Sequence, residues 1–161
     1  MSERRHTISA LVYNKPGVLA RISTLFAARG YNIDSLAVGE TDNAEVSRMT
    51  IIVRGDEKIL EQVEKQLNKL IDVIKVYEYS KTEHIERDLM LIKVSANKTN
   101  RSEIIEMVEV FRADIVDFYH DSLIIEITGD ENKLTAFVNL LKPYGIKEVV
   151  RTGVVAIARG K

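Results

Sequence analysis

The chain has 161 residues, no cysteine and a formal net charge of −1, and these values exclude several classes of protein. Without cysteine there is neither a disulfide framework nor a thiolate metal site. A charge this close to zero provides no long-range field to attract nucleic acid or an anionic membrane. Hydrophobic residues make up 45% of the chain, yet no apolar run approaches the ~20 residues that cross a bilayer. We therefore expect a soluble cytoplasmic protein of one ordinary domain or two small ones.

The first half of the chain has the pattern strand, helix, strand, strand, helix, strand. Ile8, Ala10 and Val12 recur at every second position, as in a strand with one buried face. Residues 16–29 instead carry their apolar side chains at helical spacing, and Gly30 is placed to end that helix in a left-handed conformation. We expect strands at 7–13, 31–40, 46–54 and 73–79, and helices at 16–29 and from Asp56 to Ile71.

The second half repeats this order. Gly129-Asp130-Glu131 echoes Gly55-Asp56-Glu57 at the corresponding position before a helix. We expect strands at 89–94, 114–119, 122–128 and 146–158, and helices that begin near Asn100 and Asp130. Repetition inside a chain is stronger evidence than any single assignment. The predicted fold class is therefore α+β, with two tandem ferredoxin-like βαββαβ domains at residues 1–80 and 81–161.

Some strands are apolar on both faces, which indicates that the sheets do not face water. Ile, Leu and Val occupy both parities of residues 49–53 and 89–94. A four-stranded unit of about 75 residues buries only roughly 60% of its extended surface, so further burial is usually needed. We expect the sheets to pack against other sheets, within the chain or across a homodimer.

The turn at Asn14-Lys15-Pro16-Gly17-Val18-Leu19 joins the first strand to the first helix. Pro16 suits the first helical position, and Gly17 allows close approach of a small molecule. The N–H groups of Gly17, Val18 and Leu19 would then be donors at the positive end of a helix, which favours a carboxylate. The amide of Asn14 has both donor and acceptor capacity, so it suits the ammonium or the carboxylate of an amino acid. The alternative is that Asn-x-Pro-Gly only forms a turn.

No group of residues in the sequence predicts catalysis. His6, His84 and His120 are far apart, and none lies near a Ser or Cys nucleophile motif. Asp114, Asp117, His120 and Asp121 are the candidates for a metal site, but strand alternation puts the first two on opposite faces. Neither a phosphate-binding loop nor a Gly-rich dinucleotide motif is present. We expect no catalytic residue and no metal site in this chain.

The same order of elements occurs in RNA-binding RRM domains, which stack bases on aromatic side chains of the central strands. Residues 46–54 contain no aromatic residue, and neither do residues 122–128. Together with the absence of net positive charge, this argues against RNA as a partner.

Several motifs resemble those of a known family. The turn at 14–19, followed by Arg29-Gly30-Tyr31-Asn32-Ile33-Asp34-Ser35-Leu36, resembles an ACT domain, a small-molecule-sensing module of amino-acid metabolism. Further matching stretches resemble the regulatory (small) subunit of acetohydroxyacid synthase, also called acetolactate synthase. They are Ser47-Arg48-Met49-Thr50-Ile51, residues 55–57 and 62–67, Glu86-Arg87-Asp88-Leu89-Met90-Leu91, and Arg151-Thr152-Gly153-Val154-Val155-Ala156, and the likeness covers nearly the whole chain.

The resemblance implies a non-catalytic protein that activates the catalytic subunit of acetolactate synthase in branched-chain amino-acid biosynthesis. It also implies feedback inhibition by valine, or by isoleucine or leucine, bound where two ACT domains meet in a homodimer. The matching positions are Asn14, Gly17, Val18 and Leu19 of one chain and Asn32 and Ile33 of the other. Thiamine diphosphate, Mg²⁺ and FAD are expected only in the catalytic partner.

Two other functions remain as alternatives. One is a free-standing amino-acid sensor that controls a different target, although no helix-turn-helix or basic arm indicates direct DNA contact. The other is a small enzyme on a ferredoxin-like scaffold, which the fold alone does not exclude.

Overall fold

The computed structural model describes residues 3–160, whose internal contacts divide the chain into two units. The first unit contains the residues up to Ile85 together with those from Val154 onward, and the second runs from Glu86 to Gly153. This division differs from the expected boundary at residue 80, chiefly because the C-terminal residues group with the first unit. Among the described residues, no helix is long and apolar enough to cross a membrane.

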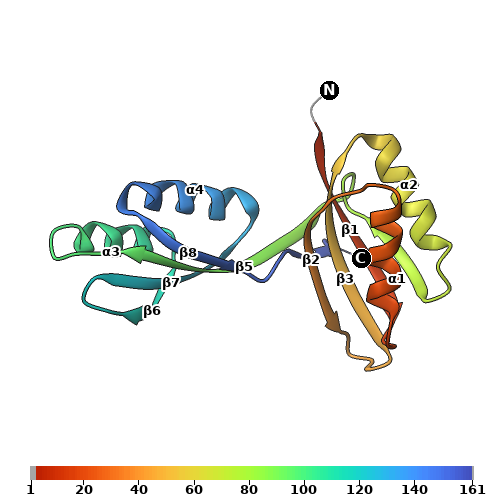
Figure 1. The fold of residues 1–161 in the computed structure, drawn as a ribbon, viewed down its shortest axis with the longest axis horizontal. Coiled ribbons are helices and arrows are strands. Elements are labelled where there is room, and N and C mark those ends of the chain that lie inside the picture. Colours follow the sequence, from red (N-terminus) through yellow and green to blue (C-terminus); the bar gives the residue numbers. More distant parts are fainter. Residues whose placement is uncertain (1–2, 161) are drawn as a thin grey trace. The chain divides into compact units, whose positions relative to one another are not determined.

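Both units follow the βαββαβ order predicted from the sequence (Figure 1). The first has β1 (Arg4–Tyr13), α1 (Val18–Ala28), β2 (Ile33–Glu40), β3 (Val46–Gly55), α2 (Glu57–Asn68) and β4 (Val73–Glu78). The repeat has β5 (His84–Ser95), α3 (Arg101–Val110), β6 (Asp114–Phe118), β7 (Ser122–Gly129), α4 (Glu131–Leu141), a 3₁₀ turn η1 (Lys142–Tyr144) and β8 (Ile146–Arg151). The prediction of an α+β protein with two ferredoxin-like repeats is confirmed.

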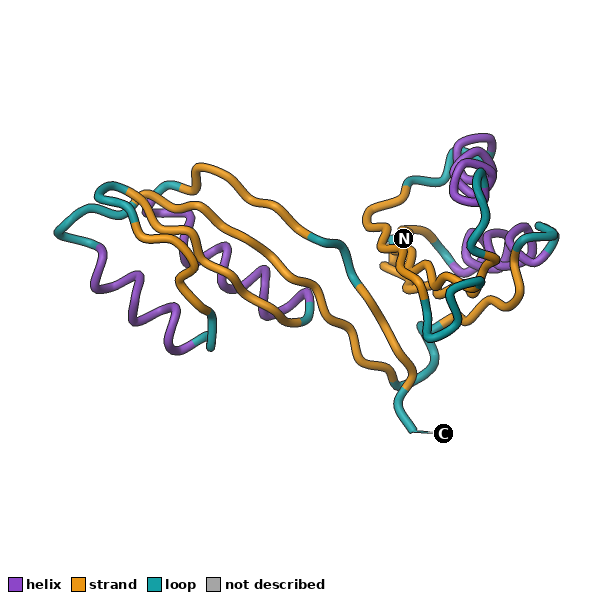
Figure 2. Tube along the Cα trace, turned by 90° about the horizontal axis from the view of Figure 1, so that it is seen from below, coloured by secondary structure: helices purple, strands orange, loops and turns teal. Residues whose placement is uncertain are grey.

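The two sheets share one antiparallel strand order. The first is β2-β3-β1-β4 and the second is β6-β7-β5-β8, so β2 and β6 are the corresponding edge strands. In each unit the helices lie on one face of the sheet (Figure 2). The hydrophobic cores fill the space between sheet and helices. Their large, fully buried members include Ile8, Phe26, Ile51 and Leu67 in the first unit and Ile92, Ile104, Ile125 and Phe137 in the second.

Two helices begin at the repeated Gly-Asp sequence, as predicted. The carboxylate of Asp56 accepts a hydrogen bond from the backbone N–H of Ile59 at 2.9 Å, and α2 begins at the next residue. Asp130 accepts the N–H of Lys133 at the same distance and starts α4. An N-terminal carboxylate satisfies a donor that has no intrahelical partner and complements the helix dipole, so a local sequence is enough to place both helix starts.

The end of α1 also follows from local sequence. Gly30 has a φ of 68°, the left-handed conformation predicted for it. The N–H of Tyr31 donates to the carbonyl of Phe26 at 3.0 Å and that of Gly30 to Ala27 at 3.1 Å, which is the Schellman arrangement. The rings of Phe26 and Tyr31 meet edge to face with centroids 6.1 Å apart, which adds the apolar contact typical of this motif.

The face of the first sheet away from the helices is partly covered by the chain itself. Tyr79, after β4, and Val154, after β8, are each only 3% exposed. The N–H of Val154 donates to the Ser35 hydroxyl on β2 at 2.9 Å, and Arg48 on β3 donates to the Tyr79 hydroxyl at 3.3 Å. Beneath these segments, residues that point away from α1 and α2 are buried, namely Thr7, Ser9, Thr50 and Ile52.

The prediction of one continuous strand from Ile146 to Ala158 is wrong. The structure has β8, which ends at Arg151, and a separate strand β9 (Val155–Ala158) that pairs with β5. Gly153, between them, has a φ of 89°, and this left-handed conformation interrupts the extended chain. The hydroxyl of Thr152 donates to Asp88 at 3.1 Å, so a contact across 64 positions of sequence helps to fix the break.

Asp88 is the buried centre of an ionic network in the second unit, and its partners Arg151 and Glu131 are 38% and 42% exposed. Its side chain is 2% exposed and accepts bonds from Arg151 Nε at 2.8 Å and Nη2 at 2.6 Å. Arg151 Nη2 also donates to Glu131 at the start of α4, at 2.9 Å. Burial lowers the pKa of Arg151, but the hydrogen bonds and charges of Glu131 and Asp88 outweigh it and raise the pKa. The network therefore ties β5, β8 and α4 together with a permanent positive charge.

We expect Arg151→Ala to lower the free energy of unfolding by about 3 kcal/mol, because it leaves the Asp88 carboxylate buried without its cation. Lys147→Ala is the matched control on the same strand. Lys147 and Asp121 are 3.7 Å apart and both exposed, so their pair contributes at most about 1 kcal/mol. Urea unfolding followed by circular dichroism measures both. Equal losses for the two variants would contradict the view that the burial of Asp88 strengthens its pair with Arg151.

Candidate functional site

The turn between β1 and α1 holds four of the six residues predicted to bind an effector. Asn14 and Gly17 are exposed, as is the rest of residues 13–17. Val18, the first residue of α1, is 4% exposed and packs in the core, whereas Leu19 is 45% exposed. The turn is thus anchored by Val18 and presents backbone groups and the side chain of Leu19 to solvent.

Gly17, not Pro16, marks the start of α1. Gly17 is the N-cap with φ 85° and ψ −7°, and the helix begins at Val18, so the prediction that Pro16 occupies the first helical position is wrong. The left-handed conformation turns the chain between Pro16 and the helix, and the carbonyl of Gly17 accepts the N–H of Arg21 at 3.0 Å. A Cβ at Gly17 would lie 3.0 Å from Nη1, at the movable end of the exposed Arg21 side chain, so it is the left-handed conformation that favours glycine here.

The N-terminus of α1 suits an anion. Gly17 supplies no side-chain cap, and the first turn contains no acidic residue. The N–H of Val18 lies 3.4 Å from the carbonyl of Lys15, a long contact, and the first N–H groups of any α-helix have no intrahelical acceptor. These donors stand at the positive end of the helix dipole, which favours a carboxylate. In contrast, α2 and α4 have their own aspartates at this position.

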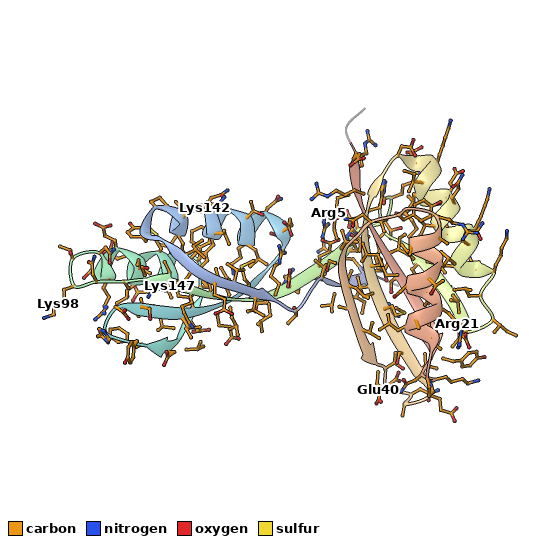
Figure 3. All side chains as sticks on the ribbon, in the orientation of Figure 1. Arg5, Arg21, Glu40, Lys98, Lys142 and Lys147 are labelled. Atoms are coloured by element: carbon orange, nitrogen blue, oxygen red, sulfur yellow. The ribbon has the colours of Figure 1, made fainter. Side chains whose placement is uncertain are left out.

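Asn14 is held against the hairpin between β2 and β3. Its side-chain Nδ2 donates to the carbonyl of Ala44 at 2.9 Å and to Glu40 Oε1 at 3.2 Å, and its backbone N–H donates to the carbonyl of Glu45 at 2.8 Å. Glu40, labelled in Figure 3, is the last residue of β2 and lies at the same end of the first unit as this turn. With both amide protons engaged, the side chain of Asn14 offers its Oδ1 acceptor to a ligand.

The two remaining predicted residues lie elsewhere in the chain. Asn32 and Ile33 stand at the start of β2, where Asn32 Nδ2 donates to Asp34 Oδ1 at 2.9 Å and Ile33 packs against the core. They follow the C-terminal end of α1, whereas Asn14 and Gly17 precede its N-terminal end. Since α1 has 11 residues, it separates the two groups by about 16 Å. One chain therefore does not bring the six residues together.

Glu40 and Arg21 also belong to this region, although sequence patterns did not indicate them. In the sheet, Glu40 pairs with Ser47, and Ser47 pairs with Val12, which lies two residues before Asn14. The strand order of a βαββαβ unit therefore predicts that Glu40 lies close to Asn14. Arg21 Nε donates to Asp72 Oδ2 at 2.7 Å. The carbonyl of Asp72 accepts the N–H of Tyr13 at 2.9 Å, which links the first turns of α1 to the end of β1.

The histidines and the acidic hairpin form no metal-binding cluster among the residues that the structure describes. His6 is buried, with Nδ1 2.8 Å from the Ser80 hydroxyl and Nε2 3.0 Å from the carbonyl of Gly55. Within residues 3–160 there is no group of three or more His, Cys, Asp or Glu that could hold a metal ion.

The pKa of Tyr144 is raised because its hydroxyl donates to Glu103 at 2.7 Å, on the surface of the second unit.

Comparison with known proteins gives consistent matches over nearly the whole chain. Residues 87–160 match the family model described as the small subunit of acetolactate synthase, and residues 8–75 match the ACT domain described as that of AHAS small subunits. A probable acetolactate synthase small subunit of Archaeoglobus fulgidus is 57% identical over 156 residues, which cover 97% of this chain and 98% of that protein. The acetolactate synthase small subunit of Mycolicibacterium smegmatis is 54% identical over 155 residues, which cover 96% of this chain and 91% of that protein.

A solved structure agrees with these matches. The crystal structure of the small subunit of acetolactate synthase from Thermotoga maritima superposes with a TM-score of 0.89 at 44% identity. The superposition covers 98% of this chain and 99% of that one, so it includes both repeats.

The conformation of Gly17 can be tested by stability alone. We expect Gly17→Ala to destabilise the protein by about 1–2 kcal/mol, because an L-residue is strained at positive φ. Gly39→Ala on β2 is the control, since a Cβ there meets nothing within 4 Å and φ is not positive. Chemical denaturation should find Gly39→Ala neutral within about 0.5 kcal/mol. If Gly17→Ala and Gly39→Ala are equally stable, the assignment of a left-handed conformation to Gly17 is wrong.

Proposed function

Because the chain belongs to the family of acetolactate synthase small subunits, we propose that it regulates a thiamine-diphosphate-dependent catalytic subunit and has no catalysis of its own. In this role it raises the turnover of the catalytic subunit and mediates feedback inhibition by valine. Thiamine diphosphate, Mg²⁺ and FAD are then cofactors of the catalytic partner. The observation that carries the regulatory part is the uncapped N-terminus of α1 beside Asn14.

The turn has the groups that an amino acid requires. The N–H donors at the start of α1 suit the carboxylate, and Asn14 Oδ1, with Glu40 beside it, suits the ammonium group. Leu19, half exposed at the same turn, provides apolar surface for a branched side chain. Valine is therefore the proposed effector, and isoleucine or leucine differ from it by one methylene, worth about 1–3 kcal/mol in such a pocket.

A homodimer would complete this site. β2 is an edge strand, so its outer side is available to pair with β2 of a second copy. In an antiparallel pairing about a two-fold axis, the Ile33 end of one strand lies beside the Glu40 end of the other. Asn32 and Ile33 of one copy then approach the turn of Asn14 and Gly17 of its partner, which removes the separation imposed by α1.

The activity of the holoenzyme tests this proposal. We expect the purified chain alone to form no acetolactate from pyruvate with thiamine diphosphate, Mg²⁺ and FAD present. Titrated into a fixed amount of the matching catalytic subunit, it should raise turnover to a plateau, and valine should reverse the gain. A tenfold inhibition requires a coupling free energy of only about 1.4 kcal/mol. A flat titration with and without valine would refute the regulatory role and favour a free-standing amino-acid sensor.

The effector turn is tested by Gly17→Asp. We expect this variant to lose valine binding, because its carboxylate would stand where the carboxylate of the ligand binds. The left-handed φ also adds a folding cost of about 1–2 kcal/mol. Gly145→Asp introduces the same charge at another glycine of positive φ (94°), in the second unit and away from the turn. Calorimetry on the folded proteins should show normal valine affinity for Gly145→Asp, and normal affinity for Gly17→Asp would reject the site.

A further inference from the structure

A shallow groove of about 580 Å³ runs between α1 and the C-terminal end of α2, and Gly17 is the one proposed effector residue that lines it. Its α1 side is formed by small side chains one helical turn apart, Ala20, Thr24 and Ala28. Leu25 and Leu70 add apolar surface to the same groove. Small residues at i, i+4 and i+8 leave a continuous trough in which another chain can approach the helix backbone closely. We call this feature the α1/α2 groove.

The α1/α2 groove is basic although the protein as a whole is not. Its lining includes Arg21, Arg29 and Lys69 and no carboxylate. Asp72 pairs with Arg21 at 2.7 Å, whereas Arg29 donates to the neutral Oε1 of Gln66 at 2.8 Å. Three cations and one carboxylate leave a local excess of two positive charges, against a net charge of −1 for the whole chain. Figure 3 shows Arg21 on α1, at the end of the first unit where Glu40 also lies.

We propose that the α1/α2 groove docks the catalytic partner through an amphipathic helical segment that carries carboxylates. An apolar trough with a cationic rim is complementary to a helix with one apolar stripe flanked by Asp or Glu. The charge excess selects an acidic segment, and the shallow opening suits a helix better than an enclosed small molecule. The inference rests on the proposed function, because the partner is the catalytic subunit of that function.

The groove and the effector turn share residues, which makes the docking surface sensitive to the effector. Gly17 caps α1 and also lines the groove. Arg21 is a groove cation, and through Asp72 it is linked to the N–H of Tyr13 directly before the turn. A ligand that changes the conformation of the turn therefore changes the groove. By linkage, the docked partner changes the affinity for valine by the same factor as valine changes docking.

The test is a charge reversal in the groove with a matched reversal outside it. Arg29→Glu/Lys69→Glu reverses two groove cations, and Lys58→Glu/Lys65→Glu makes the same change in charge at exposed positions of α2 that do not line the groove. Each full-length protein is titrated into the catalytic subunit. We expect the groove variant to raise the half-saturating concentration at least tenfold with an unchanged plateau, and the control to match the wild type. Thr24→Trp, which fills the trough without changing charge, should act like the groove variant.

Two further measurements separate this inference from the proposed function. Valine calorimetry on the isolated groove variant should match the wild type, which shows that the effector turn is intact. If the wild type activates the catalytic subunit and the groove variant does so at the same concentration, the docking site is wrong and the proposed function stands. If the groove variant instead loses self-association in analytical ultracentrifugation, the groove is a contact between copies and the inference is overturned. If the wild-type protein neither binds nor activates the catalytic subunit, both the docking inference and the proposed function are refuted.

Discussion

The hydrogen bonds that hold Asn14 to the β2–β3 hairpin are the constraint on which the proposed effector turn, residues 14–19, depends. The backbone of Asn14 bonds to Glu45 and its side chain to Ala44 and Glu40, so the turn cannot move without the end of β2. Gly17 then sets the direction of α1 by its left-handed conformation. Hydrogen bonds thus link an edge strand, a turn and a helix N-terminus, and a ligand bound at the turn would act on all three.

The second unit repeats the scaffold but has a different turn at the corresponding place. Asn97 Oδ1 accepts the N–H groups of Thr99 and Asn100 at 2.9 and 3.0 Å, and Asn100 Oδ1 accepts the N–H of Asn97 at 2.8 Å. This turn satisfies its own polar groups. Neither α1 nor α3 has a side-chain cap, but the first turn of α3 contains the acidic Glu103, whereas that of α1 contains no acidic residue. Arg101 holds the neighbouring β6–β7 hairpin by donating to the carbonyls of Tyr119 and His120. The two repeats therefore share a fold and differ in what their first turns offer a ligand.

The features that sequence predicted correctly are those that depend on nearby residues. Asp56 and Asp130 start helices through bonds three residues away, and Gly30 ends α1 through its own backbone freedom. One error is local, because the left-handed conformation of Gly17 moves the start of α1 past Pro16. The other features that the sequence did not indicate involve contacts between distant residues. The break after Arg151 involves Asp88, 64 positions before Thr152, and the place of Glu40 beside Asn14 follows from the order of three strands. Alternating hydrophobicity carries no information about such pairs.

The separation of Asn14 and Asn32 by the length of α1 has a consequence for mixed populations of subunits. Under the two-copy arrangement proposed above, each dimer contains two effector sites, and each site takes one half from either chain. A dimer of one chain damaged at the Asn14 end and one damaged at the Asn32 end would contain one site with both defects and one with none. Two alleles that are each insensitive to the effector would therefore restore partial sensitivity when expressed together, as in intragenic complementation.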